Sequence, residues 1–390
     1  MSEIQCMISE NRNMRTSGFK APLVFCLLAA FLPLGSTIGV LFSWVIFPSI
    51  AILLTFLRTR FFNRIGIYFL FSSLALLIIN YSIVLQYVSF TERLEFNMLL
   101  AIIGCFYMSV VFFSRRFNFF DLSKAIELIL IVNVVLFFIQ FVSFYVFGYR
   151  IDYSLVTGGI GSRNDYGSLY RASGIFNEPA EYSSAITVLV VSKFLINRKL
   201  SSWNIVALAS TMLSFSFVGI IQSFFVIYIV LFRKIHKKPI YLFLIVIIIF
   251  FAWFAFFDLF IDRYETFMDG SDGSNNTKLD TFNFFLSHTE YLWGGAGLIG
   301  YDPNTMPLFM QGLYDLTFFG SCISIFGIFI GSFIAIALIS YIIYNYTISD
   351  MALIFICLLK VNVMIYAMYW FFIILILILP KHIQKIKVHA

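Results

Sequence analysis

Charge is the scarcest property of this sequence. Only 12% of its 390 residues are Asp, Glu, Lys or Arg, whereas 61% are hydrophobic and 50 are phenylalanine. A soluble domain usually has about 25% charged and about 45–50% apolar residues. So little charge excludes a soluble domain of this length. The composition predicts a single all-α, polytopic membrane domain over residues 1–390.

Cysteine and histidine are also rare. The five cysteines lie in or beside apolar runs, without the spacing of a metal site or a disulfide framework. They are interpreted as small apolar side chains, and neither a metal nor another cofactor is predicted. Of the four histidines, only His288 lies outside the basic segments that hold the other three.

Long apolar runs are what the sequence has in abundance. A helix needs about 20 mostly apolar residues to cross a bilayer. Spans are predicted at residues 21–35, 38–57, 65–89, 96–113, 125–147, 179–195, 203–216, 217–232, 239–258 and 316–344. The segment 351–380 is one more span or a tight pair, which gives 11 or 12 spans. No cleavage site follows the first apolar run, so it is interpreted as an uncleaved anchor.

The basic residues predict an orientation. With the N-terminus in the cytoplasm, the inner segments hold 19 of the 26 Lys and Arg residues. Such an excess of basic residues in cytoplasmic loops is usual for membrane proteins. The basic tail then also lies inside, which favours the tight pair within 351–380. Lys360 is a charge inside this apolar run. Three explanations stay open: it pairs with an acidic partner, its side chain extends to the membrane–water interface, or it marks the bend between two short helices. Most acidic residues fall in two large outer loops, 148–178 and 259–315.

The first outer loop ends at a predicted helix start. Pro179 suits the first turn of that helix, where a missing N–H costs nothing. Glu178 and Glu181 then lie at the positive end of the helix, where they either cap it or serve chemistry. Arginines stand out against the acidic outer face and indicate an anion site. They are Arg150, Arg163 and Arg171 in the first loop and Arg263 in the second.

The second outer loop is polar at first and glycine-rich later, as if it folds back toward the membrane. Its GAGLIG at 295–300 matches the GxGxxG dinucleotide pattern, but no strand–helix–strand unit surrounds it, so nucleotide binding is discounted. Its acidic residues do not match an EF-hand, so calcium is not predicted either. Asp315 stands at the mouth of the 316–344 span, where it either caps the helix or is functional.

Three stretches resemble the bacterial O-antigen and capsule polymerases of the Wzy type. RASGIFNEPAEYSS at 171–184 is similar to an Arg-x-x-Gly-x-Phe-x-Glu-Pro stretch of that family. LWGGAGLIGYD and the later LYDLTFFGSCISIFGIFIGSF resemble its glycine-rich loop and glycine-bearing span, and LSFSFVG at 213–219 resembles a serine-containing turn. The family's Arg-x10-Gly pattern is met by Arg150 and Gly161, but fails at Arg263, where Ser274 replaces the glycine.

The resemblance implies a glycosyltransferase of GT-C-like polymerase/ligase architecture in a bacterial inner membrane, with both termini cytoplasmic and both large loops periplasmic. It implies that undecaprenyl-pyrophosphate-linked glycans are donor and acceptor, and that repeat units are polymerised into O-antigen or capsular polysaccharide. A flippase and a chain-length regulator are the implied protein partners in the lipid membrane. Nucleic acid is not an expected partner.

The implied chemistry assigns roles to residues of both loops. A pyrophosphate leaving group needs fixed positive charge, which arginine supplies through paired hydrogen bonds. An acceptor hydroxyl needs a base, and sugar faces stack on aromatic rings. The predicted pyrophosphate ligands are Arg171, Arg150 and Arg263; the predicted bases are Asp315, Glu178 and His288; the predicted sugar contacts are Tyr170, Trp293 and Tyr301.

Two other functions stay open. An O-antigen ligase of the same larger group has a functional histidine near the entry of the late span, where this chain has Tyr314 and Asp315. A polysaccharide flippase or other transporter predicts short outer loops and charges within spans, and only Lys360 has that position. Both comparisons favour a polymerase.

Overall fold

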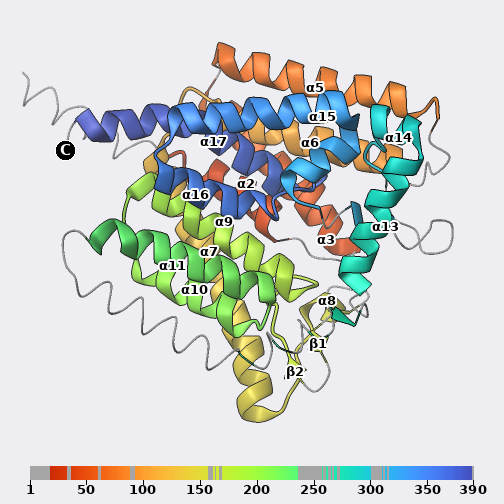
Figure 1. The fold of residues 1–390 in the computed structure, drawn as a ribbon. Helices are drawn as coiled ribbons and strands as arrows, with labels where there is room; N and C mark the ends of the chain where they lie inside the picture. The colour runs from red at the N-terminus through yellow and green to blue at the C-terminus, as the bar shows by residue number, and fades with distance from the viewer. Residues whose placement is uncertain are drawn as a thin grey trace, which may run out of the picture. The chain divides into compact units, whose positions relative to one another are not determined.

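The computed structural model describes residues 18–32, 37–59, 63–87, 93–156, 161–162, 164–166, 169–235, 257, 261, 265, 268–269, 273–299, 310, 312–313 and 316–388. Within these residues the protein is helical apart from one short β-hairpin (Figure 1). The chain forms two compact units. The first comprises Met1–Leu74, Ile102–Gly219 and Tyr366–Ala390, and the second comprises Ala75–Ala101 and Ile220–Ile365.

Seven helices in the described part are long and apolar enough to cross a membrane, which confirms a polytopic membrane protein. The first combines α3 (Thr37–Leu41), a π-helical turn (Phe42–Ile46) and α4 (Phe47–Arg58). The others are α5 (Arg64–Val84), α6 (Leu94–Phe112), α7 (Phe119–Phe147), α9 (Pro179–Asn197), α15 (Phe318–Asn345) and α17 (Ala367–Val388).

Several predicted spans are shorter than a bilayer crossing. α2 (Lys20–Phe31) and α10 (Ser202–Leu213) have 12 residues each, and α16 (Ile348–Leu358) has 11. At about 1.5 Å per residue such helices cover roughly half of the hydrocarbon core. Among the described residues, seven predicted spans are thus confirmed as long helices, whereas the total of 11 or 12 stays a prediction. The predicted span 239–258 lies outside them.

The segment 351–380 is a pair of helices. α16 ends at Leu358, and α17 begins at Ala367 after a non-helical connection. Lys360 lies in the turn that follows α16, where its backbone N–H donates to Cys357 O at 3.1 Å. Of the three explanations for this lysine, the structure supports its position at the bend.

α9 is the centre of the first unit. Its side chains from Tyr182 to Ile196 are all buried, and it packs against α7, α10 and α17. Hydroxyl groups join it to the end of α10: Tyr182 OH lies 2.6 Å from Ser210 Oγ, and Ser183 Oγ lies 2.9 Å from Ser214 Oγ. Small hydroxyl side chains let helices approach closely in a membrane.

The stretch LSFSFVG is a turn, as predicted. α10 ends at Leu213, and α11 (Phe217–Ile235) begins after three intervening residues. Ser214 in this turn is the residue that pairs with Ser183 of α9. Two of the stretches that suggested a family, RASGIFNEPAEYSS and LSFSFVG, are therefore in direct contact.

A buried ion pair joins α9 to α7. Lys193 Nζ lies 2.7 Å from Glu127 Oε1, and it also donates to Ser201 Oγ at 2.9 Å. The lysine side chain is 4% exposed and the glutamate side chain is 37% exposed. Lys193 is therefore held inside the helix bundle by its partner and is not a charge of the water-exposed surface.

Removing one partner of this pair should destabilise the protein. Glu127→Gln leaves the buried Lys193 charge without its counter-ion, which we expect to cost roughly 2 kcal/mol or more, whereas Lys193→Met leaves a partly exposed carboxylate and should cost less. The double variant should recover much of that loss, because no unpaired charge remains. Thermal unfolding in detergent, followed by tryptophan fluorescence, measures the effect. Lys124→Met, on the exposed side of α7, is the control; single variants that melt like it would contradict the prediction.

Candidate functional site in the two long loops

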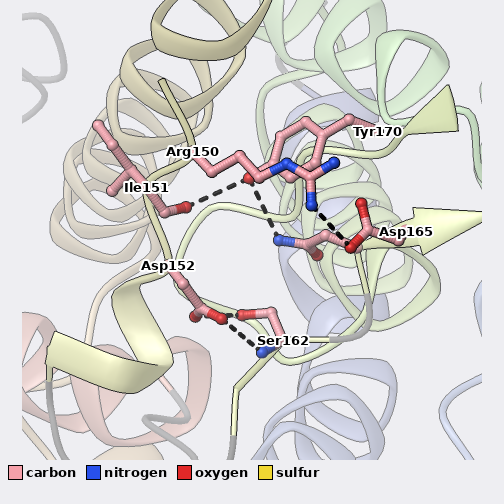
Figure 2. Close-up of polar contacts among 7 residues, drawn as sticks. Arg150, Ile151, Asp152, Ser162, Asp165 and Tyr170 are labelled. Atoms are coloured by element: carbon pink, nitrogen blue, oxygen red, sulfur yellow. Dashed lines mark hydrogen bonds and ion pairs between the residues drawn. The ribbon is translucent and has the colours of Figure 1, made fainter. Parts of the chain in front are cut away.

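The first long loop has the predicted boundaries. α7 ends at Phe147 and α9 begins at Pro179. Between them lie α8 (Tyr153–Val156) and an antiparallel hairpin of β1 (Asp165–Tyr166) and β2 (Leu169–Tyr170). Polar contacts, several of them drawn in Figure 2, hold the described part of this loop together.

Gln140 of α7 ties the loop to the helices. Its buried side-chain oxygen accepts the backbone N–H groups of Ser173 and Gly174, each at 2.8 Å. Its Nε2 donates to the carbonyl oxygen of Ile151 at 2.8 Å. An amide inside a membrane helix is costly without partners, and here the loop supplies them. One side chain thus fixes both the start of the loop and the RASG turn near its end.

Asp152 closes the first half of the loop. Its carboxylate accepts the backbone N–H of Ser162 at 2.8 Å and the hydroxyl of Ser162 at 2.6 Å (Figure 2). It also accepts the N–H of Ser154 at 2.9 Å. Gly161 has φ 100, a conformation that other residues rarely adopt. The backbone turn at Gly161, the glycine of the Arg-x10-Gly spacing, therefore places Ser162 within hydrogen-bonding distance of Asp152. Burial raises the pKa of Asp152, but the hydrogen bonds from Ser162, Ser154 and Leu155 outweigh it and leave the pKa below its usual value.

Arg150 is positioned but accessible. Its Nη1 lies 3.2 Å from Asp165 Oδ2, and both side chains are 61% exposed. Its guanidinium carbon lies 5.9 Å from the ring centre of Tyr170 (Figure 2) and 5.6 Å from that of Phe144. An exposed ion pair of this kind is worth about 0–1 kcal/mol, so an anionic ligand can displace Asp165 at little cost.

Tyr170 is built into the loop. Its ring is buried and stacks on Phe144 with centroids 4.3 Å apart, and its hydroxyl donates to Ile151 O at 3.2 Å. Burial is the main cause that raises its pKa. With Phe144 and Arg150 beside its ring, Tyr170 supports the loop. Stacking on a sugar stays a prediction and requires one of these neighbours to move.

Arg171 and Glu178 bracket the last turn before α9. The N–H of Arg171 donates to Asn164 O at 2.8 Å, and its side chain is half-buried. Glu178 occupies the N-cap position of α9 as predicted, yet its side chain makes no capping hydrogen bond. The interpretation of its carboxylate as a cap is therefore wrong. Glu181 lies in the first turn of the helix, as expected.

The second long loop is described in part. Asp315, Arg263 and Tyr301 lie outside the described residues, as do Arg163 and Tyr314. α15 begins at Phe318, and Thr317 caps it by accepting the N–H of Gly320 at 3.4 Å. Thr317, a described residue, therefore holds the N-cap position of this helix.

His288 and Trp293 are exposed residues of this loop. His288 joins α13 (Gly273–Ser287) to α14 (Thr289–Gly294), and its ring stacks on Phe284 at 4.2 Å. Its Nδ1 lies 3.0 Å from Phe284 O. Its Nδ1 also lies 3.0 Å from Ser287 Oγ. Trp293 stacks on Phe329 of α15, with ring centres 4.7 Å apart.

The glycine-rich stretch 294–299 fills a break in α15. Gly327 has φ 77 and ψ 170, which interrupts the helix within its apolar sequence. Carbonyl groups at the break accept from the stretch: Ser324 O from Ala296 N–H at 2.7 Å, and Ile325 O from Gly297 N–H at 3.1 Å. The side chain of Asn80 also donates to Ile325 O at 2.8 Å. A broken membrane helix is stable only when its freed backbone groups find partners.

Close packing explains the GxGxxG match. A Cβ atom on Gly295 would collide with the backbone of Ile325, and one on Gly327 would collide with the carbonyl group of Trp293. The glycines let two backbones approach, which is a structural reason for the pattern. The described stretch 294–299 packs into the spanning helix, in the direction that the composition of this half of the loop predicts.

The candidate residues divide between the two units. Arg150, Tyr170, Arg171 and Glu178 belong to the first unit, and His288 and Trp293 belong to the second. Sequence reasoning missed the residues that hold the loops, above all Gln140, Asp152 and Asn80. A signal existed for two of them, because Gln140 and Asn80 are amides inside apolar runs and such side chains require partners.

Gly327→Ala should destabilise the protein by at least about 2 kcal/mol, because its backbone conformation is nearly exclusive to glycine and a Cβ has no space. Thermal unfolding in detergent measures the loss. Gly320→Ala is the matched control in the same helix, where a Cβ meets only the side chain of Leu316. Equal melting temperatures for the two variants would contradict the account of the break.

Asp152→Asn should loosen the first loop at neutral pH. Because the folded-state pKa of Asp152 is lowered, its ionised form stabilises the loop above its ordinary pKa of 3.8, and that contribution disappears as the pH falls through the lower folded value. Hydrogen exchange at Ser154 and Ser162 should rise about tenfold at pH 7. The difference from the parent protein should vanish below the folded pKa. Asp165→Asn is the control, and an equal effect there would oppose the assignment.

Comparison with known proteins adds no family to this description. No family model matches the chain. No curated protein matches it significantly either. The contacts themselves establish an all-helical, polytopic membrane protein whose long loops are hydrogen-bonded to its apolar helices.

Proposed function

We propose that this protein is a glycosyltransferase that polymerises lipid-linked oligosaccharide repeat units at the outer face of a bacterial inner membrane. The donor is a glycan on undecaprenyl pyrophosphate, and the acceptor is a repeat unit on the same lipid. One observation carries the proposal: Gln140 of a spanning helix anchors the loop that bears Arg150, Arg171 and Glu178. Chemistry on a lipid headgroup needs such charged groups fixed close to the bilayer.

The arginines suit the leaving group. The acceptor hydroxyl oxygen forms a bond to the anomeric carbon of the donor, while the bond from that carbon to the pyrophosphate oxygen breaks. Negative charge develops on the departing lipid pyrophosphate, and the hydroxyl proton passes to a base. Fixed cations in a partly dry site stabilise such charge by several kcal/mol. Arg171, half-buried beside the anchored turn, is the proposed main ligand, with Arg150 and Arg263 as helpers.

Glu178 is the proposed base among the described residues. It is half-buried, stands at the start of α9, and does not use its carboxylate to cap the helix. Asp315 and His288 are the other proposed bases. For the sugars we propose Trp293, whose ring is exposed, with Tyr301 and Tyr170 as further contacts.

A flippase or other transporter is the second candidate, and the break in α15 favours it. Interrupted helices are typical of transport sites, where unwound backbone lines a cavity. Here the carbonyl groups of Ser324 and Ile325 are already occupied by Ala296, Gly297 and Asn80. Because protein groups already occupy these carbonyl groups, the break is better explained as part of a fixed scaffold than as the lining of a transport path. For a ligase, no described residue supplies a comparable argument.

Arg171→Ala should abolish polymer formation. The purified protein in liposomes receives the pyrophosphate-linked repeat unit of its source strain, and the products are separated on a gel. The parent protein should give a ladder spaced by one repeat. Arg171→Lys should also be poor, because an ammonium group lacks the paired donors of arginine. Arg150→Ala should retain more activity, because its guanidinium group already shares its charge with Asp165.

Arg116→Ala is the control, since this exposed arginine lies in the connection between α6 and α7. A full ladder from Arg171→Ala would remove the pyrophosphate role from this residue. If the parent protein gives no ladder, transfer of the glycan to lipid A core and movement of the lipid across the bilayer are measured next. Activity in either assay would replace the polymerase proposal by the ligase or the flippase.

A further inference from the structure

Helix α13 of the second unit exposes large apolar side chains although it belongs to a polar loop. Leu279, Phe282 and Leu286 are 58%, 60% and 55% exposed. Their spacing of three and four residues places them along one edge of the helix. Exposed leucines and a phenylalanine in such a row are unusual for a water-facing loop.

The helix has three distinct faces. Thr281 and Phe285 are buried and form the side that packs on the protein. Asp280, Asn283 and Ser287 are exposed polar residues. At about 100° per residue, the polar edge and the apolar edge lie on opposite sides of the packed face. A helix with this division has one side for protein, one for water and one for an apolar medium.

The apolar edge continues toward a surface that faces lipid. α13 packs on α14, and α14 packs on the spanning helix α15. Trp293 of α14 stacks on Phe329, and Phe329 and Phe333 are exposed residues of α15. In a membrane-crossing helix, such exposed apolar side chains contact acyl chains. Tryptophan in this position is typical of the boundary between lipid and water.

The direction of α13 agrees with this position. In Figure 1, α13 runs crosswise to α15, on the side where α14 meets the break at Gly327. A helix that runs crosswise to a spanning helix lies along the plane of the bilayer. Its apolar edge can then enter the acyl chains while its polar edge stays in water.

We propose that α13 is an interfacial helix, with Leu279, Phe282 and Leu286 inserted among the acyl chains of the bilayer. The partner is membrane lipid. The insertion holds the α13–α14 corner at the depth of the lipid headgroups, and it places His288 and Trp293 at that depth. This role does not depend on the reaction that the protein catalyses.

Spin labels on single cysteines test the proposal in liposomes of phosphatidylethanolamine and phosphatidylglycerol. Cys6 is replaced by serine, and the four cysteines within the described residues are buried, which protects them from a water-soluble reagent. Labels replace Leu279, Phe282 and Leu286 on the apolar edge, and Asp280, Asn283 and Ser287 on the polar edge. Phe333→Cys on α15 is the lipid-facing reference. Relaxation by oxygen, which concentrates in acyl chains, is compared with relaxation by a water-soluble nickel complex.

At the apolar edge, oxygen should relax the labels more strongly than nickel, as at Phe333. At the polar edge the order should reverse. Strong relaxation by nickel on both edges would show a water-exposed helix and overturn the proposal. Protection of the apolar edge from both reagents would show a protein partner or a second copy and would overturn it as well.

Discussion

A polar group inside the hydrocarbon of a membrane must have a partner, and this constraint determines how both long loops are attached. Each unpaired group costs several kcal/mol. Gln140 meets the requirement by binding the backbone of the first loop. The carbonyl groups at the break of α15 meet it by accepting from the second. In both places the helix is incomplete without the loop, so the loops are parts of the membrane fold.

Attachment of this kind bears on chemistry. A charged side chain on a mobile loop loses conformational freedom when it binds a ligand, at about 1–2 kcal/mol per ordered residue. Ser173 and Gly174 lose that freedom during folding, because Gln140 already holds them. Arg171 and Glu178, on either side of this turn, start from an ordered backbone. Stabilisation of a leaving group requires charged side chains that are already held in place. Gln140 of the apolar helix α7 holds the backbone turn beside them.

Local sequence predicted the loop boundaries but not the internal structure of the helices. Phe147 and Pro179 end and begin helices where the apolar runs change, and the serines at 214 and 216 form a turn. The break at Gly327 was not predictable, because Gly320 and Gly331 occur in the same apolar run without a break. What distinguishes Gly327 is the approach of Trp293, a residue distant in sequence. Of the candidate site, the arginines and Glu178 were predictable by type, whereas Gln140 and Asp152 required the contacts to be seen.

Hydrogen bonds attach both loops to their helices, but α13 of the second loop adds a contact of a different kind, and the difference fits the proposed reaction. Hydrogen bonds fix the described part of the first loop in direction and distance, which suits the site of the pyrophosphate. The α13 helix of the second loop shows an apolar edge, and apolar contacts have no preferred direction. A helix held in lipid by such contacts can shift along the surface without losing stability. An enzyme that joins two lipid-carried glycans needs a fixed site for the leaving group and tolerance for an acceptor that arrives through the bilayer. A first loop fixed by hydrogen bonds and a second loop with a lipid-held α13 would provide both.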